Sequence, residues 1–244
     1  TIAPGWTLLR MVAAIALVIA IGTGTYAGLT STAEWRRVSY DESYEALGMH
    51  DLRVRLSDGS YAHAGALRAV ALDLDDVDVA AAQERLLVPT QVDASTAEET
   101  ILVRGQLVGL PGDVEIDRVH ITDGRGLTPT GTGTTGGSIE AVLETKFAAS
   151  HELPPEGSLT LPGEREAGWV GHGIAPEQFW ITPDQGGILF SAGTYAVLYV
   201  PLASAQDVAG RPDQVNDLGV RLSPGADRDA AIEQPGERHL GQPR

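Results

Sequence analysis

Six histidines are the first residues to weigh for catalysis or metal binding, and the chain has no cysteine that could join them as a ligand. They are His50, His63, His120, His151, His172 and His239. A helical zinc or catalytic site needs two histidines at a close, fixed spacing, as in H-E-x-x-H. No pair in this chain has such a spacing. We therefore expect no catalytic residue, no metal site and no cofactor.

Two other segments contain residue types that could bind a ligand, but each lacks a required member. Asp73 to Asp78 (DLDDVD) is similar to the start of a calcium loop, without its glycine and its closing glutamate. Gly131 to Ser138 (GTGTTGGS) has the glycines of a phosphate loop but no lysine. Solvated loops explain both segments. No G-x-S-x-G elbow is present, although a Ser/His/Asp triad built from distant residues stays open.

Trp169 and Trp180 are candidate contacts for a partner protein. Trp169 lies in Gly168 to Gly173 (GWVGHG), and Trp180 follows Phe179. Exposed tryptophans are frequent at the centre of protein interfaces, whereas buried ones pack in a core or between subdomains. The sequence leaves both alternatives open.

The charge balance excludes nucleic acid as a partner. The chain has 33 acidic and 17 basic residues, with a formal net charge of -16. A surface of this sign repels phosphate backbones and anionic lipid headgroups.

The elements that must position these residues begin with an apolar run. Met11 to Leu29 (MVAAIALVIAIGTGTYAGL) carries no charge, and as a helix it spans ~28 Å, about the hydrocarbon thickness of a bilayer. A cleaved signal peptide is the alternative, with Arg10 as its n-region and Ser31 to Ala33 as its cleavage site. We favour a retained helix because the run is long and because Gly24 and Gly28 form a small face for packing against other helices.

Beyond this run, the hydrophobic pattern predicts a strand, helix, strand order twice, over Asp51 to Val92 and over Tyr195 to Leu222. The second strand of the first unit is expected over Val77 to Val92, with an interruption near Arg85. The stretch between the two units is rich in strand patterns. The strand Ile101 to Leu110 contains Gly105 and Gly109, which we expect to mark bulges or bends.

In their order along the chain, several segments resemble the extracytoplasmic core domain of FtsX-like/MacB-like permeases, the membrane subunits of one class of ABC transporters. Each motif is weak alone, and their order and spacing carry the resemblance. The segments are LRVRLS, VDVAAAQERLLVPTQV, ILVRGQLVGLPG, RVHITDGRGLTP, AVLETKFAASHELPPEGSLTL, AVLYVPLASAQDVAG and VNDLGVRLSPGAD.

The resemblance implies an α+β fold that follows one N-terminal transmembrane helix. It implies a split βαβ (ferredoxin-like, Porter-type) subdomain with an inserted β-rich (Sabre-type) subdomain. The expected parts are a cytoplasmic N-terminus over 1–10, the transmembrane helix over 11–29, a stalk helix over 30–50, the split subdomain over 51–95 and 195–233, the inserted subdomain over 96–194 and a polar tail over 234–244.

The resemblance also implies a non-catalytic domain that couples cytoplasmic ATP hydrolysis to substrate export, lipoprotein handling or transmembrane signalling. Its expected partners are a cytoplasmic ABC ATPase subunit, a second permease chain or half, an extracytoplasmic protein and membrane lipid. We expect a cell-membrane location, with a single pass in this chain and the main domain outside the cytoplasm. The chain begins with Thr1 and lacks the later membrane helices of such permeases, so we expect a piece of a longer protein. The alternative is a single-pass, membrane-anchored sensor or binding module that acts without an ATPase.

Overall fold

The computed structural model describes residues 41–74, 77–96, 99–128, 134–135, 138–178, 192–226 and 228, together with Leu17, Ile19, Ala20 and Thr23. The chain forms two units, Thr1–Ala46 and Leu47–Arg244. In the first unit, residues 41–46 and the four isolated residues are helical. The rest of the expected membrane helix, including Gly24 and Gly28, lies outside the described residues. Within the described part of the chain, no helix is both long enough and apolar enough to span a bilayer.

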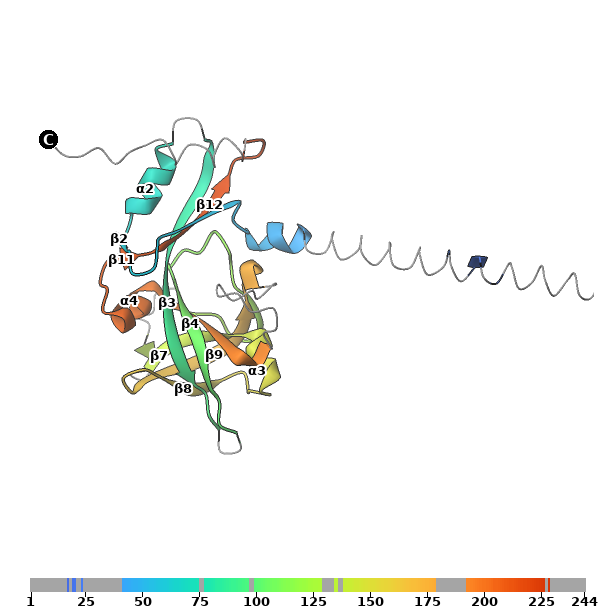
Figure 1. The fold of residues 1–244 in the computed structure, drawn as a ribbon, viewed down its shortest axis with the longest axis vertical. Coiled ribbons are helices and arrows are strands. Elements are labelled where there is room, and N and C mark those ends of the chain that lie inside the picture. The colour runs from blue at the N-terminus through green and yellow to red at the C-terminus, as the bar shows by residue number, and fades with distance from the viewer. Residues whose placement is uncertain are drawn as a thin grey trace, which may run out of the picture. The chain divides into compact units, whose positions relative to one another are not determined.

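The second unit is rich in strands and has few helices, so the mixed α+β class expected from the sequence is confirmed. Its described elements run in the order β1 (Leu52–Arg55), β2 (Ala62–His63), α2 (Ala66–Leu72), β3 (Val79–Asp93), β4 (Leu102–Leu110), β5 (His120–Gly124), β6 (Thr134–Thr135), β7 (Ser138–Glu144), α3 (Thr145–Ser150), β8 (Gly157–Leu161), β9 (Arg165–Ile174), η1 (Pro176–Gln178), η2 (Ala192–Thr194), β10 (Tyr195–Pro201), α4 (Leu202–Ala209), β11 (Gln214–Val215) and β12 (Asp217–Leu222) (Figure 1).

At one end of the sheet, β12 lies between β1 and β3 and is antiparallel to both. Strands β1 and β3 are therefore parallel to each other, and α2 connects them, which is a split β-α-β arrangement. Glu84 of β3 fixes the start of α2, because its carboxylate accepts hydrogen bonds from the backbone N–H groups of Gly65 and Arg68.

Strand β3 runs without a break from Val79 to Asp93, so the interruption expected near Arg85 is wrong. What changes at Arg85 is the neighbouring strand. Residues up to Arg85 pair with β12, and residues from Leu86 onward pair with β4. A charged side chain in the middle of an apolar run marks this change of partner.

The remaining strands extend the sheet in the order β3-β4-β10-β7-β9-β5. Strand β10 is parallel to β4 and antiparallel to β7. Because side chains alternate along a strand, the sheet has two apolar faces. Leu107, Leu143 and Leu198 belong to the main core, while Val108 and Tyr199 belong to a second cluster.

Gly105 and Gly109 do not form bulges, because β4 keeps a continuous register with both β3 and β10. Their role is close packing. A Cβ atom at Gly105 would lie 2.5 Å from the backbone oxygen of Ala196, and one at Gly109 would lie 2.6 Å from the Cβ of Ala205 in α4.

Candidate functional site

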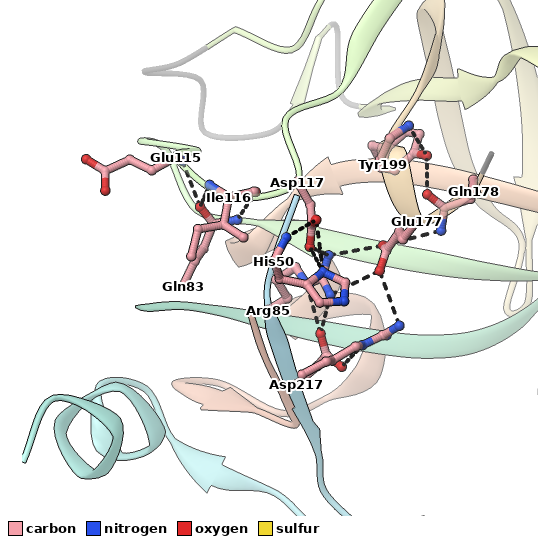
Figure 2. A network of polar contacts seen from close by, with 12 residues as sticks. His50, Gln83, Arg85, Glu115, Ile116, Asp117, Glu177, Gln178, Tyr199 and Asp217 are labelled. Carbon is pink, nitrogen blue, oxygen red and sulfur yellow. Dashed lines mark hydrogen bonds and ion pairs between the residues drawn. The ribbon is translucent and has the colours of Figure 1, made fainter. Parts of the chain in front are cut away.

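A cluster of charged side chains lies where the segment before β1 meets β3, β12 and η1. We call it the Arg85 network, and Figure 2 shows most of it. Its members are His50, Arg53 of β1, Arg85 of β3, Asp117 of the loop before β5, Glu177 of η1 and Asp217 of β12. Arg85 and Asp117 are each 1% exposed and Asp217 is 0% exposed, so the centre of the network is buried.

Arg85 is the centre of this network. Its Nη2 lies 2.6 Å from Oδ2 of Asp217, and its Nη1 lies 3.1 Å from Oδ2 of Asp117 and 3.0 Å from Oε1 of Glu177. Its Nε donates to Asp217 as well, at 2.8 Å. Only a guanidinium offers planar donors in several directions, so a lysine could not make this set of contacts.

The pKa values of the buried groups reflect the same contacts. Burial alone would lower the pKa of Arg85, but Glu177, Asp217 and Asp117 outweigh it and raise that pKa. For the carboxylate of Asp117 the effect of burial is the opposite, because burial alone would raise its pKa. The hydrogen bond from His50 and the charge of Arg85 outweigh burial and lower the pKa of Asp117. Both side chains therefore stay charged at neutral pH.

Asp117 also joins the network to the start of the second unit. Its backbone N–H donates to the carbonyl of Gly48 at 2.9 Å, and the N–H of Arg118 donates to the carbonyl of Leu47 at 2.9 Å. The Nδ1 atom of His50 lies 2.8 Å from Oδ2 of Asp117. Asp117 has a positive φ of 54°, which turns its backbone toward Gly48 while its carboxylate faces Arg85.

The loop that contains Asp117 is fixed from its other side by Gln83 of β3. The side-chain oxygen of Gln83 accepts from the N–H of Glu115 at 2.8 Å and of Ile116 at 3.1 Å. Its side-chain nitrogen donates to the carbonyl of Ile116 at 2.8 Å. The residues Leu47–His50 are thus bonded to a loop that β3 itself holds; we call this arrangement the N-terminal clamp.

The network continues to β10. Next to Glu177, Gln178 accepts a hydrogen bond of 2.8 Å from the Tyr199 hydroxyl, which in turn accepts from the N–H of Ala175 at 3.0 Å (Figure 2). Tyr199 is 1% exposed. A chain of polar contacts therefore connects the N-terminal clamp with the centre of the β-rich sheet.

Three ligand-type side chains of the network lie close enough to be considered for a metal ion. Ligand atoms of His50, Asp117 and Glu177 lie within 4.8 Å of one another. However, the guanidinium of Arg85 already lies against the Asp117 and Glu177 oxygens, and a divalent cation there would face a buried positive charge. The two arginines and three carboxylates sum to -1, so a divalent cation would leave the cluster with a net positive charge. The donor set fits an ion-pair network better than a metal centre.

The structure places the residues singled out from the sequence in different environments. Trp169 is 5% exposed and donates its indole N–H to the carbonyl of Pro154 at 2.8 Å. A Cβ at Gly157 would lie 2.2 Å from its ring, so Trp169 packs in the core and is not a surface contact for a partner. Of the two alternatives left open for Trp169, the structure shows the buried one, and Trp180 lies outside the described residues. Of the six histidines, only His50 belongs to the Arg85 network among the described residues.

Four members of the network were not predicted from the sequence as site residues: Arg85, Asp117, Glu177 and Asp217. Their separations along the chain reach 132 residues between Arg85 and Asp217, and no local spacing relates them. One signal was available, because an arginine inside an apolar strand pattern requires buried carboxylates as partners.

No protein-family model and no curated protein matches the chain. Among solved structures, it is similar to the extracellular domain of the noncanonical ABC-type transporter YknZ from Gram-positive bacteria, with 14% identity, a TM-score of 0.44, and 71% of this chain and 83% of that chain covered. The structural neighbours are extracellular or periplasmic domains of transporter permeases. The periplasmic region of MacB from Actinobacillus actinomycetemcomitans has 11% identity, a TM-score of 0.47 and coverage of 80% and 84%. A domain of a permease from Porphyromonas gingivalis has 14% identity, a TM-score of 0.38 and coverage of 69% and 72%. These neighbours are of the class that the sequence motifs resemble.

Proposed function

We propose that this chain is the extracytoplasmic domain of an ABC-type permease subunit, carried by a membrane helix over Met11 to Leu29. In this role the domain does no chemistry itself. A separate cytoplasmic ATPase hydrolyses ATP, and the membrane helix passes the resulting motion to the domain. The ordered motifs from LRVRLS to VNDLGVRLSPGAD support the family. The finer division into a split βαβ subdomain and an inserted β-rich subdomain is part of the same proposal.

The observation that carries the proposal is the N-terminal clamp. Any displacement that reaches Leu47 along the chain meets backbone hydrogen bonds to Asp117 and Arg118. The Asp117 carboxylate contacts Arg85 of β3, and Arg85 in turn contacts Glu177 of η1 and Asp217 of β12. A buried network with satisfied partners is rigid, because moving one member would leave charges unpaired in a medium of low dielectric constant. The domain should therefore follow the segment before β1 as one body.

The first test is co-purification of the full-length protein from its native membranes. An affinity tag on the protein should retain an ATPase subunit with a Walker motif and a second permease chain or half. A single-pass sensor or binding module would be retained without any ATPase, and that result would contradict the proposal.

The second test concerns membrane topology. Because the chain has no cysteine, an introduced cysteine is its only site for a thiol reagent. Thr7→Cys and Asp58→Cys are introduced singly, Asp58 being exposed in a turn. In whole cells, a membrane-impermeant maleimide should label only the cysteine at position 58. Labelling at position 7 alone would contradict the proposed orientation.

A further inference from the structure

Strand β3 belongs to two parts of the sheet. Its first half, up to Arg85, pairs with β12, and its second half, from Leu86, pairs with β4 on the opposite side (Figure 1). We call β1, α2, β12 and the first half of β3 the split part, and the second half of β3 with β4, β10, β7, β9 and β5 the β-rich part. The strand changes its neighbour between these two residues, so the angle between the parts depends on the contacts that cross this junction.

Asn216, the residue before β12, bonds to both sides of the junction. Its backbone N–H donates to the carbonyl of Arg85 at 3.2 Å, and its carbonyl accepts from the N–H of Leu56 at 2.9 Å. Its side chain reaches past the junction to Leu87. The N–H of Leu87 donates to Oδ1 of Asn216 at 2.8 Å, and Nδ2 of Asn216 donates to the carbonyl of Leu87 at 2.9 Å. The backbone of Asn216 therefore belongs to the split part, while its side chain binds the β-rich part.

The side-chain amide of Asn216 takes the place of a strand partner. Leu87 lies opposite Val108 of β4, but its own N–H and C=O bind Asn216 and so point away from β4. Strand β12 begins only at Asp217, so a side chain must supply the donor and the acceptor that a neighbouring backbone would offer. Leu87 is 2% exposed, and losing both hydrogen bonds would leave two polar backbone groups buried without their partner.

We propose that Asn216 is a latch that fixes the angle between the split part and the β-rich part. The Arg85 network crosses the same junction through Glu177, and Asn216 adds a direct tie to the backbone of β3. The latch is a property of the fold, whereas its use in carrying motion from the N-terminal clamp into the β-rich part rests on the proposed function.

Distance measurement by pulsed electron spin resonance tests the latch on the full chain in detergent. Because the chain has no cysteine, spin labels can be placed on Ala69→Cys in α2 and Ala203→Cys in α4, which are both exposed. The doubly labelled protein should give one narrow distance distribution. Adding Asn216→Leu, which has a similar volume but no hydrogen-bonding groups, should broaden it. Hydrogen exchange at the Leu87 amide should become about tenfold or more faster in the same variant.

Asn216→Asp separates hydrogen bonding from space filling. The introduced carboxylate has no donor for the carbonyl of Leu87, and the charged side chains beside it, Asp217 and Arg85, already bind each other. Burial against that carbonyl disfavours its charged form and raises its pKa above the ordinary value of about 3.9. Once protonated, the carboxyl can accept from the N–H of Leu87 and donate to its C=O, as the amide does. The distribution should therefore be broad at about pH 8 and return to the wild-type width at about pH 4.5.

Three controls accompany this comparison. Asn216→Leu should stay broad at both pH values, because it cannot bond Leu87 in either. Gln91→Leu and Gln91→Glu, at an exposed position in the second half of β3, should leave the wild-type distribution unchanged at both.

An unchanged distribution in Asn216→Leu would overturn the latch. So would an Asn216→Asp distribution that is as broad in acid as at neutral pH, and this second comparison decides alone if Asn216→Leu does not fold. The measurement needs no ATPase, so a failed latch leaves the proposed function standing, and a failed co-purification leaves the latch standing.

Discussion

Replacing Arg85 by methionine should be among the most destabilising single changes in the second unit. The substitution removes a 1% exposed guanidinium and leaves Asp117, Asp217 and Glu177 without their main counter-charge. Breaking a buried ion pair from one side costs about 3–5 kcal/mol, because the remaining charge stays buried and unpaired. Against a typical domain stability of about 5–15 kcal/mol, this is a large fraction. Arg104→Met, at an exposed position of β4, should change the free energy of unfolding by less than about 0.5 kcal/mol.

The loss of unfolding free energy in Arg85→Met should become smaller as the pH falls. In the wild type, the pKa of Asp117 is lowered from 3.8, so its contribution is present above that pH and is lost as the pH falls below it. Without Arg85, one of the charges that lower the pKa of Asp117 is gone, and burial raises that pKa relative to the wild type. The variant then regains stability as Asp117 takes up a proton at a higher pH than in the wild type. The difference in unfolding free energy between wild type and Arg85→Met should therefore shrink as the pH falls from about 8 to about 5.

Urea unfolding of the full chain in a mild non-ionic detergent, followed by tryptophan fluorescence, measures both effects, since Trp169 is buried. Neutralising the orphaned acids in the same molecule, with Asp117→Asn, Glu177→Gln and Asp217→Asn, should restore about 2 kcal/mol or more. A loss below about 1 kcal/mol for Arg85→Met, or a loss that grows on acidification, would show that Arg85 is not the counter-charge that stabilises these carboxylates.

Three further changes test other parts of the account. Gly105→Ala should cost about 1–3 kcal/mol of unfolding free energy, since the new Cβ would lie 2.5 Å from a backbone oxygen of β10, whereas Gly168→Ala, with its nearest atom at 3.4 Å, should cost less in the same urea titration. Burial raises the pKa of Glu144 above 4.5, so the wild type loses stability as the pH rises through the raised value. The unfolding free energy of Glu144→Gln should therefore increase relative to that of the wild type between about pH 5 and pH 8. A difference that does not depend on pH would contradict this. Replacing both Gly24 and Gly28 by leucine should weaken assembly with other membrane helices, measured by co-purification, without changing the unfolding of the second unit.

The sequence predicted best the elements whose hydrophobic pattern is local. Strand β4 was expected within one residue of its observed bounds, and the unit expected over Tyr195 to Leu222 begins where β10 begins and ends where β12 ends, because these strands are apolar runs between turn residues. Arg85 was misjudged for a physical reason. A charge in an apolar run is ordinarily a break, and only the pairing of β3 with β12 brings Asp217 next to it.

The candidate site could not be found from spacing. His50 and Asp117 are 67 residues apart, and Arg85 and Glu177 are 92 apart. Their meeting depends on the path of the loop before β5, which Gln83 and the left-handed backbone of Asp117 fix. Neither feature has a sequence pattern. The burial of Trp169 was also not predictable from its own segment, because it depends on the space left by Gly157 in the neighbouring strand.

We propose that the N-terminal clamp carries ATP-driven motion into the domain, and this motion can be followed by energy transfer. The full-length permease with Asp58→Cys is reconstituted with its ATPase in vesicles, and energy transfer is measured from a dye at position 58 to acceptor lipids. Trapping with ATP and vanadate should change the transfer efficiency in the wild type. In Asp117→Asn the change should be lost while ATP turnover persists, and in Asp207→Asn, a change in an exposed ion pair, it should be retained. An unaltered response in Asp117→Asn, or no response in the wild type, would contradict the account.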